Sequence, residues 1–494
     1  MSSAFTRRSS LLASTCAAFA LSGCMVGPNF EAPKPAVPAA YTNDAPPKSA
    51  YVSTDSVNPQ WWTSFDDPTL TQLEAQAVAQ NLDLQIATQR LMEAAAQAQI
   101  TGAVLYPSLS GNASYEREGL SKTGIVAAFG SSGGAGIPIG GIPPFDVYQY
   151  GLGLQYDLDL WGKNRRAVEA AVANTRSAVE SRRSALLNVQ TQVASTYIQI
   201  RGAETLMAIT QKNLDAANQL VQLTVERQQA GLTTSLDVAN ARATASSIQS
   251  QLPTLIAQRD AQIGQLGLLL GETPSGLPTD LVTAAPVPLT PPSVPVGLPS
   301  DLLQRRPDVR MATEDLHAAT AEIGVAKAQF FPDISFAPTA ALQSLQFKDL
   351  NQWTALTYTF GPTMTLPLFE GGQLTGQLKL RNAQQQEAAL GYAKTVLTAF
   401  TQVNTALTTY TQEHATLDAL NTDVQQANIA LGLAEDQYKQ GLTDYLTVLD
   451  AQQAYLAAQT NQAQSVTRMA TDLVTLYQAL GGGWEPVYPE QQGG

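Results

Sequence analysis

The chain repeats its own pattern once, and this internal duplication constrains its fold more than any other feature of its 494 residues. Segment 441–452 aligns with segment 231–242 at a shift of 210 positions, with Gly, Leu, Thr, Leu, Val and Ala retained. In both copies an amphipathic run ends at Gly, which suits the left-handed end of a helix, and Thr, Ser or Asp follows as an N-cap. Each copy therefore predicts a tight turn between two long helices.

The repeat extends over most of the chain. Tyr106-Pro107 matches Phe331-Pro332, and the chain reads as two tandem units of roughly 200 residues each. Two copies are too few for a solenoid, so the units must assemble in another way. The predicted parts are a first repeat, a Pro-rich linker, a second repeat and a flexible tail, at 61–271, 272–300, 301–480 and 481–494.

Composition argues against several functions. The formal net charge is −13, and no basic face is visible for binding nucleic acid. His317 and His414 are the two histidines, far apart and without the spacing of metal ligands, so we expect packing or surface roles and no metal or cofactor. No phosphate-binding loop, catalytic carboxylate pair or Ser/His/Asp set stands out, so we do not expect an enzyme.

The N-terminus has the pattern of a secretory signal. Residues 1–23 combine an Arg pair, a short apolar run and small residues. Leu21-Ser22-Gly23-Cys24 is similar to the lipobox of bacterial lipoproteins, which predicts a diacylglycerol on the sulfur and an acyl chain on the nitrogen of Cys24. The alternative is an ordinary signal with an incidental Cys. Residues 24–60, rich in Pro, Ala and Ser, are predicted to be a lipid-anchored tether.

Between the helical stretches the apolar period changes from about 3.6 to 2. In 148–160 Tyr and Leu alternate with Gly, Gln and Asp, and a similar alternation recurs in 356–368. These strands predict one β-hairpin in each repeat, at about 108–160 and about 334–368. An aromatic-rich face opposite a Gly/Thr/Gln face is typical of transmembrane β-barrel strands, although a soluble sandwich also alternates. Because four strands cannot close a barrel and open edges are costly in lipid, the membrane interpretation requires an oligomer.

The helical runs are very long. The pattern that begins after Gly162 continues nearly to Gly231, and about 65 residues at 1.5 Å each reach about 100 Å. The return run reaches Gly271, and Pro253 predicts a kink or break within it. A cytoskeletal or adhesin-like coiled coil would explain these helices but neither the hairpins nor the lipobox.

Several motifs resemble one family. The most specific is Leu302-Leu303-Gln304-Arg305-Arg306-Pro307-Asp308-Val309, followed by Ile323-Gly324-Val325-Ala326 and Phe331-Pro332. Val26-Gly27-Pro28-Asn29-Phe30 after the lipobox and the pair Trp61-Trp62 add to it. Together they resemble the TolC-like outer membrane efflux proteins, in particular the lipid-anchored NodT family.

The resemblance implies a mainly helical chain whose homotrimer forms a 12-stranded barrel in the outer membrane and a 12-helix periplasmic tunnel. It further implies a periplasmic adaptor and an inner-membrane pump of the RND type as partners. The expected function is a passive duct for drugs or other small molecules, in the outer membrane of a Gram-negative bacterium. Two rivals remain: a duct for protein secretion, and a structural or adhesive lipoprotein without a pore.

The resemblance also assigns roles near the turns. Tyr438 matches a gating Tyr, Asp450 a luminal Asp, and Asp237 an acid that ties the inner to the outer helix pair. Thr443 stands where some members have an Arg, and Thr447 where some have a second luminal Asp, so a strong charged latch is not expected. Asp237 alternatively completes a capping box, and Asp450 alternatively lies on a solvated helix face.

The turns themselves are the expected docking tip for the adaptor. The residues so assigned are Gly231, Leu232, Thr233, Gly441, Leu442 and Thr443.

Overall fold

The structure is a computed structural model, and it describes residues 25–36, 51–53, 55–119, 121, 143–273, 276 and 283–488. The predicted signal peptide 1–23 and Cys24 lie outside the described residues. The chain divides into two compact units. Unit 1 takes its residues from 1–32, 93–175 and 314–389, and unit 2 from 33–92, 176–313 and 390–494.

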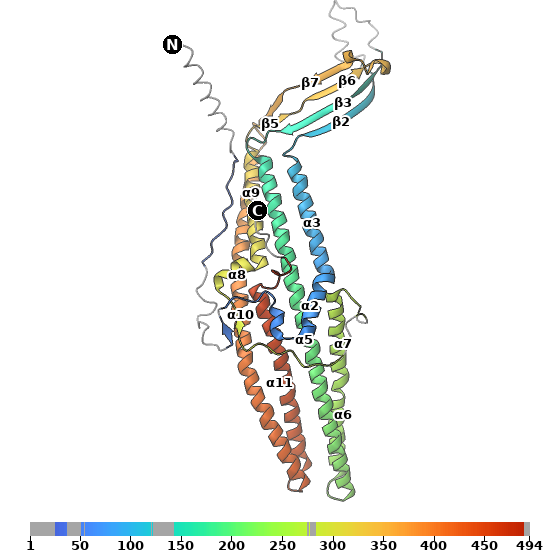
Figure 1. Ribbon diagram of the computed structural model, residues 1–494, viewed down its shortest axis with the longest axis vertical. Helices are drawn as coiled ribbons and strands as arrows, with labels where there is room; N and C mark the ends of the chain where they lie inside the picture. Colours follow the sequence, from blue (N-terminus) through green and yellow to red (C-terminus); the bar gives the residue numbers. More distant parts are fainter. Residues whose placement is uncertain are drawn as a thin grey trace, which may run out of the picture. The chain divides into compact units, whose positions relative to one another are not determined.

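An antiparallel sheet forms the strand part of unit 1. Its strands are β2 (Ser108–Glu118), β3 (Phe145–Asp157), β5 (Asp333–Phe336), β6 (Thr339–Ser344), β7 (Leu356–Thr359) and β8 (Pro362–Thr365). One edge of β3 pairs with β2, and the other pairs with β6 and then β5, which pair in turn with β7 and β8. Figure 1 shows β2, β3, β6 and β7 side by side. The two predicted hairpins therefore join into one sheet.

Two helices have the predicted length. They are α5 (Lys163–Gln229) and α10 (Gln373–Lys439), with 67 residues each. At 1.5 Å per residue each is about 100 Å long. These two, with α3 (Leu82–Ala103) and α9 (Pro307–Ala328), contribute residues to both units. Among the described residues, no helix is long and apolar enough to cross a membrane.

In unit 2 each long helix turns back into a second helix, so that two hairpins end in tight turns (Figure 1). The first returns as α6 (Ser235–Gln249) and α7 (Gln251–Leu270), and the second as α11 (Tyr445–Leu480). The break predicted from Pro253 is present at Ser250. It lies there because Pro253 has no N–H to donate to the carbonyl of Gln249, whereas α11 contains no Pro and is continuous.

The first helical run of the chain is two helices and not one. It is divided into α2 (Pro68–Gln80) and α3 at Asn81. The buried Asn81 side chain accepts a hydrogen bond from Leu84 N–H at 3.0 Å and donates to the Leu269 carbonyl at 2.7 Å. Its own side chain therefore caps the new helix, and the division also ties α3 to α7.

The main core of unit 2 contains aromatic side chains among its aliphatic ones, and it includes residues from segments that precede and follow the long helices. Trp61 stacks on Tyr477 with ring centroids 5.4 Å apart, and both are buried. The other short elements of the described residues are η1 (Trp61–Phe65), α8 (Pro299–Arg305), η4 (Phe347–Asp349), η5 (Trp353–Ala355) and the parallel strand pair β1 (Val52–Ser53) and β4 (Val294–Pro295). The strand pair joins the predicted tether to the predicted linker.

The prediction of a flexible tail from residue 481 is wrong for residues 481–488. Trp484 is only 3% exposed, and its indole N–H donates to the carbonyl oxygens of Arg305 at 3.0 Å and Gly481 at 3.1 Å. The Arg183 guanidinium lies 4.3 Å from the indole ring centre. The tail segment is therefore part of the core, because a large aromatic side chain follows the three glycines. Residues 489–494 lie outside the described residues.

Candidate functional site

The turn of the first hairpin has the two predicted features, a left-handed glycine that ends one helix and an N-cap residue that begins the next. Gly231 adopts φ +74°, a value that favours glycine, and Leu232 N–H donates to the carbonyl of Arg227 at 2.8 Å. Thr234 then caps α6 and forms a capping box with Asp237. Asp237 also accepts a hydrogen bond from the Thr233 hydroxyl at 2.5 Å. This bond is the main cause of a lowered pKa of Asp237, and the Thr234 N–H adds to it.

The second turn has the same backbone conformation, but Asp takes the cap position and Thr the position three residues later. Gly441 has φ +76°, and Asp444 caps α11 by accepting from the N–H of Thr447 at 3.1 Å and from its hydroxyl at 2.8 Å. The Thr443 hydroxyl donates to the Thr447 hydroxyl at 2.9 Å. One repeat thus has Thr at the cap and Asp three residues later, and the other has the reverse. Thr443, Thr447 and Asp237 all bond within their own turns.

A small buried cluster joins the two hairpins beside these turns. Its members come from α5, α6, α10 and α11: Leu220, Ala241, Ala434, Tyr438, Tyr445 and Val448. The ring of Tyr438 is packed edge-on to the ring of Tyr445, with centroids 6.0 Å apart. The Tyr438 hydroxyl is buried without a hydrogen-bond partner among the described residues. Tyr438 therefore lies where the two hairpins meet.

Arg227, which was not among the residues predicted for this site, makes a polar contact between the hairpins at this end, and the side chains of Tyr445 and Thr244 make another. Its guanidinium donates to the Tyr438 carbonyl at 2.7 Å, and its central carbon lies 4.5 Å from the Tyr438 ring centre. The available signal was a lone Arg near the end of α5, in a repeat whose partner has Gln437 at that place. A lone Arg at this place does not predict a contact with α10.

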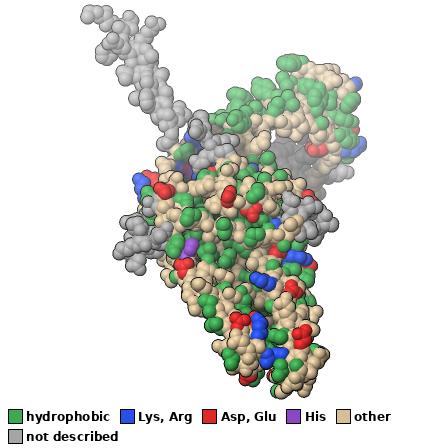
Figure 2. Space-filling model, turned by 60° about the horizontal axis from the view of Figure 1, so that its bottom comes forward, with side chains coloured by type: hydrophobic (Ala, Val, Ile, Leu, Met, Phe, Trp, Pro, Cys, Tyr) green, Lys and Arg blue, Asp and Glu red, His purple; other side chains and the backbone are tan. Residues whose placement is uncertain are grey.

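Asp450 lies on α11 and is exposed. It has no ion pair with any other described residue. Leu232 and Leu442, at the turns, are 67% and 73% exposed. Figure 2 shows charged side chains of both signs at the helical end of the face it presents. The tip thus combines exposed apolar side chains with charges.

Both histidines have packing roles, as expected. In unit 1 His317 stacks on Phe30 at 4.4 Å and contacts Glu169 at 3.0 Å. In unit 2 His414 stacks on Tyr51 at 3.9 Å, and burial lowers the pKa of His414. Among the residues with described positions, no group of three metal-binding side chains is found.

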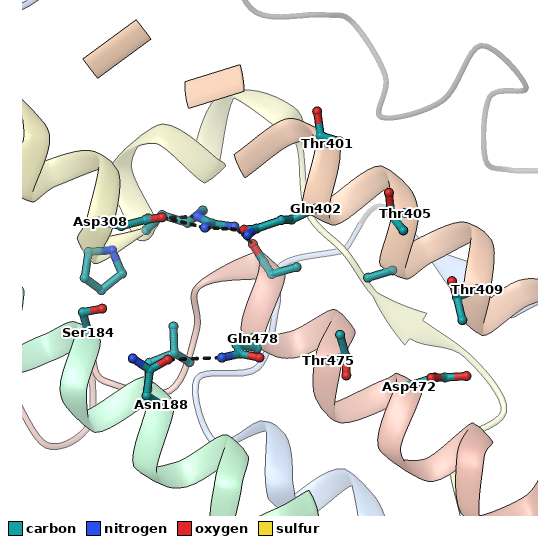
Figure 3. A pocket seen from close by; sticks show the side chains of 15 residues that line it. Ser184, Asn188, Asp308, Thr401, Gln402, Thr405, Thr409, Asp472, Thr475 and Gln478 are labelled. Atoms are coloured by element: carbon teal, nitrogen blue, oxygen red, sulfur yellow. Dashed lines mark hydrogen bonds and ion pairs between the residues drawn. The ribbon is translucent and has the colours of Figure 1, made fainter. Parts of the chain in front are cut away.

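A pocket of about 520 Å³ opens in unit 2 between α5, α10 and α11 (Figure 3). Thr401, Thr405 and Thr409 line it along α10. Arg306 donates to both carboxylate oxygens of Asp308, at 2.9 and 2.6 Å, and to the Gln402 amide oxygen at 2.7 Å. The charged groups of this network are thus paired with each other, which fixes the start of α9 against α10.

These features define a class: a chain of paired long helical hairpins that carries a β-sheet. The chain belongs to the family of outer membrane efflux proteins, whose sequence model matches residues 73–272 and 298–482. The antibiotic efflux pump outer membrane protein ArpC of Pseudomonas putida is 34% identical over 485 residues, which are 96% of each chain. The pyoverdine export outer membrane protein OpmQ of Pseudomonas aeruginosa is 31% identical over 430 residues, 86% of this chain and 88% of that protein.

Solved channel structures have the same fold. The outer-membrane channel OprN superposes with a TM-score of 0.86 at 29% identity, covering 94% of this chain and 100% of that one. CusC gives a TM-score of 0.82 at 26% identity, covering 93% and 100%. The predicted family and fold class are confirmed. The chain is an outer-membrane channel of an efflux pump in a Gram-negative bacterium, and its family consists of channels, not enzymes.

Proposed function

We propose that three copies of this chain close one 12-stranded barrel and one 12-helix periplasmic tunnel. The observation that carries the proposal is the open sheet: among the described strands, β2 pairs only with β3, and β7 only with β6. Large apolar side chains on the sheet are exposed, including Tyr358 at 73% and Met364 at 65%. The unpaired backbone groups of an open strand edge are costly in lipid, and they are satisfied when copies pair edge to edge. The exposed apolar side chains suit the lipid-facing surface of such a barrel.

The helical tip is the proposed gate and docking end. Tyr438, Asp450, Thr443, Thr447 and Asp237 are the gate residues, and the turns centred on Leu232 and Leu442 receive a periplasmic adaptor. Exposed leucines beside charged residues suit a partner that docks with an apolar contact and a polar rim. The adaptor joins the duct to an inner-membrane pump of the RND type, and the chain conducts small molecules passively.

The N-terminal part supports a lipid anchor. Cys24 is the proposed site of acylation, with residues 24–60 as the tether. The segment that follows is fixed to unit 1, because Val26 N–H donates to the Trp161 carbonyl at 3.1 Å and Arg166 donates to the Asn29 side chain at 2.6 Å. Palmitate labelling of wild type and Cys24→Ser tests this part: labelling of the serine variant would refute it.

Growth inhibition tests the function. A strain that lacks this chain, compared with one complemented by it, is grown with antibiotics, dyes, detergents and metal ions. Sensitisation that complementation reverses is expected, and the sensitive compounds define the exported class. The mass of the detergent-extracted protein tests the assembly, since a monomer would contradict the trimer. An unchanged panel, with a redundant channel deleted, would favour secretion of proteins instead.

A further inference from the structure

Arg227 is the cation that bridges the tips of the two hairpins within one chain. Its Nη1 donates to the carbonyl oxygens of Tyr438 at 2.7 Å and Lys439 at 3.3 Å, and these carbonyls belong to the last turn of α10. Carbonyl groups at a helix C-terminus carry partial negative charge, so a guanidinium is favoured there. The same guanidinium lies over the face of the Tyr438 ring, a favourable position for a cation.

The contact is not required by the turn itself. The backbones of Arg227 and its repeat partner Gln437 play the same part, since each carbonyl accepts the N–H of the Leu that follows the turn Gly, at 2.8 and 2.9 Å. Among the described residues, Gln437 makes no reciprocal side-chain hydrogen bond to the first hairpin. The bridge is therefore an addition in one repeat, made by the side chain of Arg227 alone.

The bridge is also built to open. Arg227 has no ion pair with a carboxylate among the described residues, and its Nε lies buried without a partner. The bonds of Arg227 are charge-assisted on the donor side only, because the carbonyls are neutral, and water can replace the carbonyls as acceptors when the hairpins separate. The Tyr438 hydroxyl is buried where the hairpins touch and has no hydrogen-bond partner among the residues that the structure describes, so separation of the hairpins would hydrate a group whose burial is costly. If the side chain of Arg227 is removed, the cost of burying the Tyr438 hydroxyl is no longer offset by the bridge, and separation of the hairpins becomes more favourable.

We propose that Arg227 is a positioning residue of the channel: it holds the α10–α11 hairpin against the α5–α6 hairpin, and the tip opens when this bridge breaks. The inference rests on the proposed role of the tip as the gate. It assigns the closing contact to a guanidinium of the first repeat acting on the backbone and ring of Tyr438, and not to the carboxylate of Asp237, whose bonds remain in its own turn.

The test is conductance of the purified full-length protein in planar lipid bilayers. Arg227→Ala is expected to raise the conductance at low voltage about tenfold, because a charge-assisted hydrogen bond and a cation–π contact are lost. The matched control is Arg242→Ala, which removes the same charge from an exposed position on α6. The control is expected to remain within about twofold of wild type, since charges at such exposed positions are largely screened. Equal conductance of the two variants would overturn the proposal.

Two further variants separate this inference from the gate itself. Tyr438→Leu removes the ring but keeps the carbonyl. If it raises the conductance and Arg227→Ala does not, the gate stands and the role of Arg227 is refuted; if neither variant changes it, the proposed gate fails too. Arg227→Lys keeps the charge but loses the planar group, so an intermediate rise is expected. If Arg227→Ala does not assemble, Arg227→Lys becomes the deciding variant. A conductance of Arg227→Lys equal to that of wild type would then overturn the proposal. Unchanged thermal unfolding of the trimer separates a positioning role from a general loss of stability.

Discussion

Gly202 of α5 and Thr467 of α11 lie in direct contact, with no room for a side chain on the glycine. A Cβ atom at Gly202 would lie 2.6 Å from the Thr467 hydroxyl oxygen and 2.7 Å from its methyl carbon. Real Cβ atoms do not approach other atoms so closely, so the two helices would have to move apart. The glycine therefore sets the separation of α5 and α11 at this level of unit 2.

Gly202→Ala is expected to destabilise the protein although alanine favours helices. Helix propensity would contribute about 1 kcal/mol in favour of alanine, while overpacking costs about 1–3 kcal/mol. Thermal unfolding in detergent measures the result. Thr467→Ala removes both atoms that clash, so the double variant is expected to recover part of the loss. A double variant as unstable as the sum of the two single ones would contradict this account.

Trp484→Ala is expected to destabilise unit 2 by about 3–5 kcal/mol, the usual cost of replacing a buried tryptophan by alanine. The indole fills core space and satisfies the carbonyls of Arg305 and Gly481. A chain that ends after Tyr488 is the control, because it removes only residues 489–494. An unfolding temperature of Trp484→Ala equal to that of this shortened chain would show that the tail segment does not support the core.

Glu74 gives a pH-dependent prediction. It is 1% exposed, neither carboxylate oxygen has a hydrogen-bond partner in the described part of the chain, and burial raises the pKa of Glu74 well above 4.5. The folded state therefore holds a proton that the unfolded state releases, so the free energy of unfolding falls as pH rises from about 4.5 to the raised pKa of Glu74. Glu74→Gln is expected to raise the unfolding temperature at pH 8 and to change it little at pH 4. Glu93→Gln, at an exposed site on α3, is the control. A gain of Glu74→Gln that is the same at both pH values would contradict the prediction.

Much of this architecture could be predicted from periodicity and repetition, because they report local structure directly. The turns at Gly231 and Gly441, the capping box of Asp237 and the break near Pro253 all follow from backbone chemistry within a few residues. The features that the sequence did not predict depend on contacts between segments that are distant in the chain. Trp484 follows three glycines and looks like part of a tail until α8 is placed beside it.

The contact of Arg227 with Tyr438 could not be predicted for the same reason. Nothing in its neighbourhood indicates that its guanidinium reaches a carbonyl 211 positions away. The family resemblance directed attention to carboxylates at the turns, but Asp237 bonds within its own turn. The guanidinium of Arg227 reaches Tyr438 only because the two hairpins pack together, and no local sequence pattern contains that packing.

Substitution of Asp450 tests whether this residue faces the lumen of the channel. In the proposed trimer three copies of this exposed carboxylate form a ring, and a ring of acidic side chains attracts cations. Asp450→Ala is expected to increase the leak conductance of the closed channel or to raise the concentration of trivalent cation needed for half block, by at least about threefold. Asp423→Ala, which removes an exposed carboxylate from α10, controls for the change in net charge. Bilayer recordings of Asp450→Ala that match wild type in both leak and block would place Asp450 on an ordinary solvated helix face, and would leave the cation preference of the channel to other residues.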